Sequence, residues 1–159
     1  MMGRIKFILM ASVFLGACAT DPGTDSGPVS SAPPASSAGP AASSAEYFNQ
    51  LVGNSVYFEL DKYELNNSAE ITLRGQASWL NQNPSRNIVV EGHCDERGTR
   101  EYNLGLGERR ANAVRDYLTS LGVAPSRIRT ISYGKERPVC VGSNEDCWSK
   151  NRRSVSVVK

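Results

Sequence analysis

A strand-to-helix junction decides the fold of this chain: Asn87-Ile-Val-Val-Glu-Gly-His-Cys-Asp-Glu-Arg-Gly-Thr-Arg-Glu-Tyr-Asn-Leu-Gly-Leu-Gly-Glu-Arg-Arg110. The apolar run at 87–91 predicts a strand buried on both faces, as in the middle of a sheet. A helix is predicted from near Thr99 to Leu121, because apolar residues recur at helical spacing up to that point. Gly122 then suits the position just after a helix. The junction carries an acid, Asp95, and an arginine, Arg110, in a place where α/β proteins often bind ligands.

The segments on either side complete a β-α-β-α-β-(α)-β order. Strands are predicted at 55–60, 127–133 and 154–158, since these segments are rich in β-branched and aromatic residues. Helices are predicted from a cap at Asn67 or Ser68 to about Asn81, and over 144–150. We therefore expect an α/β (α+β) sandwich, with a mixed sheet packed by helices on one side or both.

The N-terminus has the pattern of an export signal at residues 1–17. Arg4 and Lys6 accompany a mostly apolar run at 5–15 that is too short to span a membrane. Leu15-Gly-Ala-Cys18 resembles the lipobox of bacterial lipoproteins, which predicts N-acyl and S-diacylglycerol lipid on Cys18. Several acyl chains would hold the protein on a membrane face outside the cytoplasm. The alternative is an ordinary secretory signal.

Residues 18–45 are expected to form a disordered tether behind the lipid. Residues 19–45 are mostly Ser, Ala, Pro, Gly and Thr, with no aromatic side chain to build a core. Residues 46–159 are then one domain. Without the signal the chain has 16 basic and 16 acidic residues, counted by removing Arg4 and Lys6 from the 18 basic residues. A neutral chain is not expected to bind nucleic acid.

The junction suits ligand binding better than catalysis. Asp95 and Arg110 could together hold a zwitterionic small molecule, or they could pair with each other and close the loop onto the helix. Asn103 could orient the loop or hydrogen-bond a ligand, and the sequence leaves both alternatives open.

The sequence supports a catalytic site or a metal site less well than a ligand-binding site. His93 has no nucleophile at a recognisable position, so we expect neither an enzyme nor a cofactor. A metal site at His93 and Cys94 is disfavoured because neighbouring strand residues point to opposite faces. The acid pairs that could imitate a glycosidase have no apolar pocket to raise a pKa, and are expected to be solvated: Glu91 with Asp95, and Glu101 with Glu108.

Cys140 and Cys147 lie around a predicted turn and, in an exported protein, are good candidates for a disulfide. Cys94 is then the odd cysteine of the domain, expected to be buried and inert.

Four motifs resemble the OmpA-like domain family, and most closely its branch of peptidoglycan-associated lipoproteins. They are Glu91-Gly-His-Cys-Asp-Glu-Arg-Gly-Thr-Arg-Glu-Tyr-Asn, Leu106-Gly-Glu-Arg-Arg-Ala-Asn-Ala-Val, Ile131-Ser-Tyr-Gly-Lys-Glu-Arg-Pro and Asn151-Arg-Arg, and the likeness covers about residues 54–158. The family usually has Thr at the position of Cys94, and the Cys140 and Cys147 pair is not general to it.

The resemblance implies noncovalent binding of peptidoglycan through meso-diaminopimelate of the stem peptide. Arg110 would hold a diaminopimelate carboxylate and Asp95 an ammonium, with the two charges held apart for the ligand. Asp61 matches a further ligand-contacting acid, and Arg97 and Asn103 match other pocket positions.

The resemblance also implies an outer-membrane lipoprotein of the Tol–Pal system, facing the periplasm and acting in envelope integrity and cell division. TolB would be its second partner, on a surface that overlaps the peptidoglycan site. The rival interpretations are an OmpA-like lipoprotein of another envelope machine, and a cell-wall hydrolase that uses Asp95, Glu108 or His93.

Overall fold

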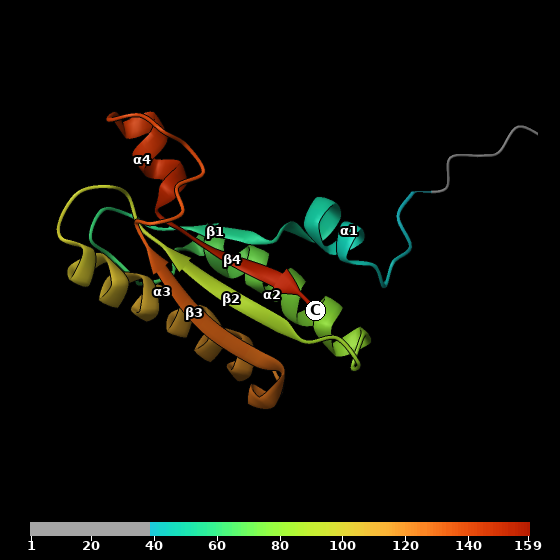
Figure 1. Ribbon diagram of the computed structural model, residues 1–159. Coiled ribbons are helices and arrows are strands. Elements are labelled where there is room, and N and C mark those ends of the chain that lie inside the picture. Colours follow the sequence, from blue (N-terminus) through green and yellow to red (C-terminus); the bar gives the residue numbers. More distant parts are fainter. Residues whose placement is uncertain (1–38) are drawn as a thin grey trace, which may run out of the picture. The chain divides into compact units, whose positions relative to one another are not determined.

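The computed structural model describes residues 39–159, so the predicted signal, Cys18 and most of the predicted tether lie outside the described residues. Figure 1 shows the elements in chain order: α1 (Ala45–Tyr47), the π-helical turn η1 (Phe48–Gly53), β1 (Ser55–Tyr57), α2 (Asn67–Gln82), β2 (Ile88–His93), α3 (Arg100–Ser120), the 3-10 turn η2 (Pro125–Arg127), β3 (Ile128–Gly134), α4 (Glu145–Asn151) and β4 (Arg153–Val158). None of the helices within residues 39–159 has the length and apolar character needed to cross a membrane.

These strands form one mixed sheet in the order β1-β4-β2-β3. Strand β2 pairs parallel with β3 and antiparallel with β4, and β4 pairs antiparallel with β1. The predicted element order and the mixed sheet are confirmed, and β2 occupies the central position that its apolar run predicted.

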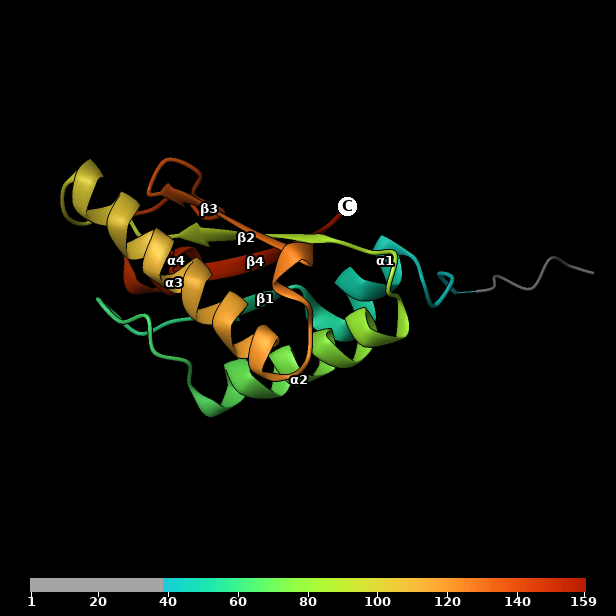
Figure 2. The same cartoon turned by 90° about the horizontal axis from the view of Figure 1, so that it is seen from below.

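Helices α2 and α3 lie against the same face of the sheet, as Figures 1 and 2 show from two directions. Alternate strand residues face these helices and meet their apolar side chains. This core includes Val56, Ile88, Val90 and Ile128 from the sheet, and Leu73, Leu80, Val114 and Leu118 from the helices. Burying each such side chain contributes roughly 1.5–3 kcal/mol. The core therefore fixes α3, which carries much of the site, against β2.

Two predicted boundaries are wrong. The strand predicted at 55–60 ends at Tyr57, because the chain turns at 59–62, where the Lys62 N–H donates to the Glu59 carbonyl at 3.2 Å. Asp61 in this turn has a φ of 58°, in the left-handed region. The cap of α2 is Asn66 and not Asn67 or Ser68, since the Asn66 side chain accepts the Ala69 N–H at 2.8 Å.

Contacts with the domain begin before residue 46. The Trp79 indole N–H donates to the Ala42 carbonyl at 2.7 Å, and α1 starts at Ala45. Phe48, in the unpredicted turn η1, is fully buried, with its ring centroid 4.8 Å from that of Trp79. The N-terminal turns therefore close one end of the core.

Two glycines bring α3 directly onto β2. A Cβ on Gly92 would lie 1.8 Å from the carbonyl oxygen of Gly107, and a Cβ on Gly107 would lie 3.0 Å from that of Gly92. Only glycine permits this approach, because any larger side chain would separate the two backbones. The contact places Arg110, less than one turn beyond Gly107, beside the end of β2.

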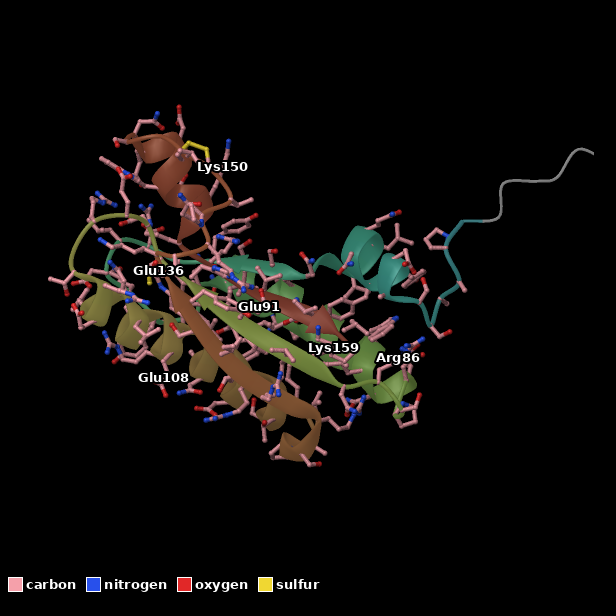
Figure 3. The ribbon with its side chains drawn as sticks, in the orientation of Figure 1. Arg86, Glu91, Glu108, Glu136, Lys150 and Lys159 are labelled. Carbon is pink, nitrogen blue, oxygen red and sulfur yellow. A yellow bond between two sulfur atoms is a disulfide. The ribbon has the colours of Figure 1, made fainter. Side chains whose placement is uncertain are left out.

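The short helix α4 is confirmed, with Asn144 as its N-cap. A disulfide joins Cys140 to Cys147, as the sequence predicted, and appears as the yellow bond beside α4 in Figure 3. The side chain of Asn151 closes the same loop, since it accepts the N–H of Val139 at 2.8 Å and donates to the carbonyl of Cys140 at 2.8 Å. We call residues 138–151 the α4 loop.

Candidate ligand-binding site

A cavity of about 310 Å³ opens beyond the C-terminal end of β2, next to the first turns of α3. It brings together all five predicted ligand-binding residues: Asp61, Asp95, Arg97, Asn103 and Arg110. Leu60, Cys94, Gly98, Tyr102, Leu106 and Arg152 complete its lining. Three guanidinium groups and two carboxylates therefore surround one small space, which suits a ligand that carries both signs of charge.

Arg110 is the most deeply buried charge of this cavity, with no exposed surface. Its Nε donates to the carbonyl of Lys62 at 2.8 Å, Nη1 to that of His93 at 2.9 Å, and Nη2 to that of Glu59 at 3.1 Å. A guanidinium has five N–H groups, so these bonds leave one on each terminal nitrogen. Burial lowers the pKa of Arg110 from its ordinary value.

The possible ion pair between Asp95 and Arg110 is not what the structure shows. Asp95 pairs with Arg97, whose Nη2 lies 2.6 Å from Oδ2, and with Arg152, whose Nη1 lies 3.3 Å from the same oxygen. Burial alone would raise the pKa of the Asp95 carboxyl, but hydrogen bonds from Arg97 and Arg152 outweigh it and hold the pKa below its ordinary value. Asp95 is therefore an anion in the same cavity as Arg110, and each has its own partners.

Arg152 is buried and joins Asp95 to the α4 loop. Its Nε donates to the carbonyl of Phe58 at 3.1 Å, and its Nη2 contacts the carboxylate of Glu145. The five ligand-binding residues predicted from the sequence do not include Arg152. The signal was present, since Arg152 lies in one of the four motifs that carried the family resemblance.

Asn103 orients the loop that leads into α3. Its Nδ2 donates to the carbonyls of Arg97, at 2.7 Å, and Thr99, at 3.0 Å, and the residue is buried. Asp61 lies across the cavity and is exposed, and its carboxylate accepts the hydroxyl of Tyr102. Asp61 thus has acceptor positions left for a ligand, whereas both amide N–H groups of Asn103 already donate to carbonyls of the loop.

Cys94 is buried at the cavity wall. Its Sγ donates to the carbonyl of Asn103 at 3.3 Å, so a thiol makes a bond that the hydroxyl of the family's threonine could have made. Burial raises the pKa of the thiol to about 11, and the group is neutral and unreactive.

The groups proposed for a hydrolase do not come together. Asp95 lines the cavity, but neither His93 nor Glu108 does. In Figure 3, Glu91 belongs to the sheet and Glu108 to α3, in two different layers. The His93 ring lies beside Tyr133, with the two ring centroids 5.6 Å apart.

His93 is expected to make the domain acid-sensitive. Burial, with Arg153 and Arg137 nearby, lowers its pKa from 6.5 to about 4, and neither ring nitrogen has a hydrogen-bond partner within the described residues. The unfolded chain therefore binds a proton more readily, and stability falls by roughly 3 kcal/mol as the pH drops from 6.5 to 4. Glu91, whose Oε2 lies 3.7 Å from Nε2, is the nearest acid.

Urea unfolding between pH 4 and 7 would measure this loss. The variant His93→Phe keeps a ring beside Tyr133 but cannot titrate, so its stability should fall less over the same range. Equal pH dependence in both proteins would contradict the assignment to His93.

The sequence of this chain matches a known protein family. The sequence pattern of the OmpA family matches residues 57–152. The chain belongs to the OmpA family. Over 115 residues it is 56% identical to the peptidoglycan-associated lipoprotein of Mesorhizobium japonicum and 53% identical to that of Brucella melitensis, and each alignment covers 72% of this chain and 68% of the relative.

The OmpA-family assignment extends to solved structures. The crystal structure of the peptidoglycan-associated lipoprotein from Burkholderia pseudomallei matches with a TM-score of 0.67 and 41% identity, covering 70% of this chain and 96% of that one. Every residue that lines the cavity, from Leu60 to Arg152, falls inside the OmpA-family match.

Proposed function

We propose that the cavity binds peptidoglycan noncovalently, through the meso-diaminopimelate residue of its stem peptide. The observation that carries the proposal is the cavity in which Arg110 and two acids, Asp61 and Asp95, face one space. The relatives in Mesorhizobium and Brucella, named for their association with peptidoglycan, support the same ligand.

The chemistry of diaminopimelate matches this arrangement. The free end of its side chain carries an ammonium and a carboxylate on one carbon. The two remaining N–H groups of Arg110 can donate to the carboxylate in a bidentate contact, and the carboxylates of Asp61 and Asp95 are the acceptors for the ammonium. A stem peptide with lysine lacks that carboxylate, and would leave part of Arg110 unpaired at a cost of about 1–3 kcal/mol.

The wider role that we propose is a tether between the outer membrane and the cell wall. Lipid on Cys18 would anchor the chain, the predicted tether would span the gap, and the domain would hold peptidoglycan without cleaving it. We further propose TolB and the Tol–Pal system as partners, with a role in cell division. Leu60, Tyr63 and Tyr102 are exposed close to the Asp61 side of the cavity and would form part of a TolB surface that overlaps the ligand site.

The variant Asp95→Asn tests the ligand. It keeps the size of the side chain and removes the charge that an ammonium requires, so affinity for a diaminopimelate stem peptide should fall about 10–100-fold, the value of a hydrogen bond to a charged group. The measurement is calorimetric titration of the full-length protein, with sedimentation of purified sacculi as a second assay.

Asp116→Asn is the matched control, because Asp116 is exposed and pairs with Arg115 away from the cavity. It should bind like the unmodified protein. Full binding by Asp95→Asn would refute the site, and release of soluble muropeptides from sacculi would favour the hydrolase.

A further inference from the structure

The carboxylate of Asp95 has no acceptor position left for an ammonium. It accepts from the backbone N–H of Arg97 at 3.1 Å and from Nε at 3.3 Å on Oδ1, and from Nη2 of Arg97 at 2.6 Å and Nη1 of Arg152 at 3.3 Å on Oδ2. A carboxylate offers about four such positions. A ligand ammonium can therefore reach Asp95 only if one of the two guanidinium groups withdraws.

Arg97 is the group that can withdraw. Its side chain is 35% exposed, whereas that of Arg152 is 6% exposed and is also held by the carbonyl of Phe58. Withdrawal of the Arg97 side chain would free one position on each oxygen of Asp95. The displaced guanidinium would be held in one place, and not simply solvated, only where a second partner lies within reach.

The α4 loop already provides that partner. The guanidinium carbon of Arg97 lies 4.1 Å from the ring centroid of Trp148, and Nη2 lies 3.9 Å from Oε2 of Glu145. The Trp148 ring is itself fixed, since its Nε1 donates to the Glu96 carboxylate at 3.0 Å. Glu145 and Trp148 lie on a segment that the Cys140–Cys147 disulfide closes.

We propose that Glu145 and Trp148 are specificity-determining residues, which hold Arg97 when the ammonium of a ligand replaces it on Asp95. This inference rests on the proposed function. It makes the α4 loop part of the mechanism that recognises the amine, although neither residue lines the cavity. The carboxylate of Glu145 would compensate the charge of the displaced Arg97. The planar guanidinium of Arg97 would stack on the ring of Trp148.

Two peptides separate this role from a merely structural one. One is a diaminopimelate stem peptide, and the other is the same peptide with its side-chain amine acetylated, which cannot displace Arg97. In calorimetric titrations of the full-length protein, Glu145→Gln should bind the free amine about five-fold more weakly, the upper range for an exposed ion pair. Its affinity for the acetylated peptide should not change, so the ratio of the two affinities falls.

Asp146→Asn is the matched control for charge. Asp146 is the next residue of α4, is exposed, and forms no ion pair within the described residues. This variant removes the same charge from the same turn and should keep the ratio of the unmodified protein. An equal fall in both variants would mean that only the overall charge of α4 matters, which would overturn the inference.

Substitution of the ring provides an independent readout. Trp148→Phe keeps an aromatic face for Arg97 and should retain most of the discrimination, whereas Trp148→Ala should lose it. The indole emission of the unmodified protein should shift when the free-amine peptide binds, but not with the acetylated peptide, and Trp148→Phe should lack this shift.

The outcomes distinguish the inference from the function on which it rests. If the folded, unmodified protein binds neither peptide, the proposed function fails and the inference fails with it. If it binds the free-amine peptide but Glu145→Gln and Trp148→Ala keep the ratio of affinities, the inference alone is overturned.

Discussion

Arg110→Ala is expected to destabilise the domain by about 3–5 kcal/mol, and to remove ligand binding with it. The side chain has no exposed surface and bonds to carbonyls of Glu59, Lys62 and His93. Alanine would remove the donor that Arg110 supplies to the carbonyls of Lys62 and His93, whereas the Glu59 carbonyl keeps the Lys62 N–H. It would also leave a void beside Phe58, whose ring lies 5.1 Å from the guanidinium carbon. Urea unfolding followed by circular dichroism measures the loss.

The neighbouring arginine is the matched control. Arg109 is exposed, with its guanidinium 5.6 Å from the ring of Tyr63, so Arg109→Ala should change stability by no more than about 0.5 kcal/mol. Arg110→Lys keeps the charge but cannot reach three carbonyls with one nitrogen, and should fall between the two. If Arg110→Ala were as stable as Arg109→Ala, Arg110 would be a ligand group alone and not also a structural one.

Arg110 both holds the fold together and lines the cavity. Loss of binding in Arg110→Ala cannot be separated from loss of the fold, because the arginine holds the 59–62 turn against the end of β2. Asp95 bonds to Arg97 and Arg152 and not to the 59–62 turn, so Asp95→Asn, with its folding checked by circular dichroism, is the sharper test of ligand recognition.

Local sequence patterns predicted correctly those element ends that are set by contacts between neighbouring residues. Thr99 accepts the N–H of Tyr102 as the cap of α3, and Gly122 has a φ of 91° just after its end. The same approach failed after Tyr57. The Phe58 N–H still bonds to the Arg152 carbonyl in the register of β1 and β4, but the chain then turns at 59–62, where Nη2 of Arg110 bonds to the Glu59 carbonyl. That contact joins residues far apart in the chain, and no local pattern reports it.

Contacts between residues far apart in the chain also decide the geometry of the site. Spacing alone left an ion pair between Asp95 and Arg110 as one of two alternatives, since both flank one junction. The partners that decide otherwise are distant: Arg110 bonds to a carbonyl 51 residues away, and Asp95 to an arginine 57 residues away. Only the family resemblance placed Asp61, Asp95 and Arg110 around one ligand before the structure was known.

Gly92→Ala is expected to be the other severe substitution, at about 3 kcal/mol or more. The new Cβ would lie 1.8 Å from the carbonyl oxygen of Gly107 and 2.6 Å from its carbonyl carbon. Both are backbone atoms in the middle of α3, so the clash cannot be relieved by rotation of a side chain. The helix must move away from β2, and Arg110 must move with it.

Gly105→Ala is the control, because this glycine lies two residues from Gly107 on the same helix. Its Cβ would meet only the far end of the Arg109 side chain, at 3.5 Å. Alanine is favoured over glycine within a helix by about 1 kcal/mol, so this variant should be as stable as the unmodified protein or more so. Thermal unfolding and peptide titration of both variants would show whether closeness of helix to strand, and not helix propensity, sets the geometry of the cavity. A stable Gly92→Ala protein with full affinity would mean that α3 can separate from β2 without disturbing Arg110.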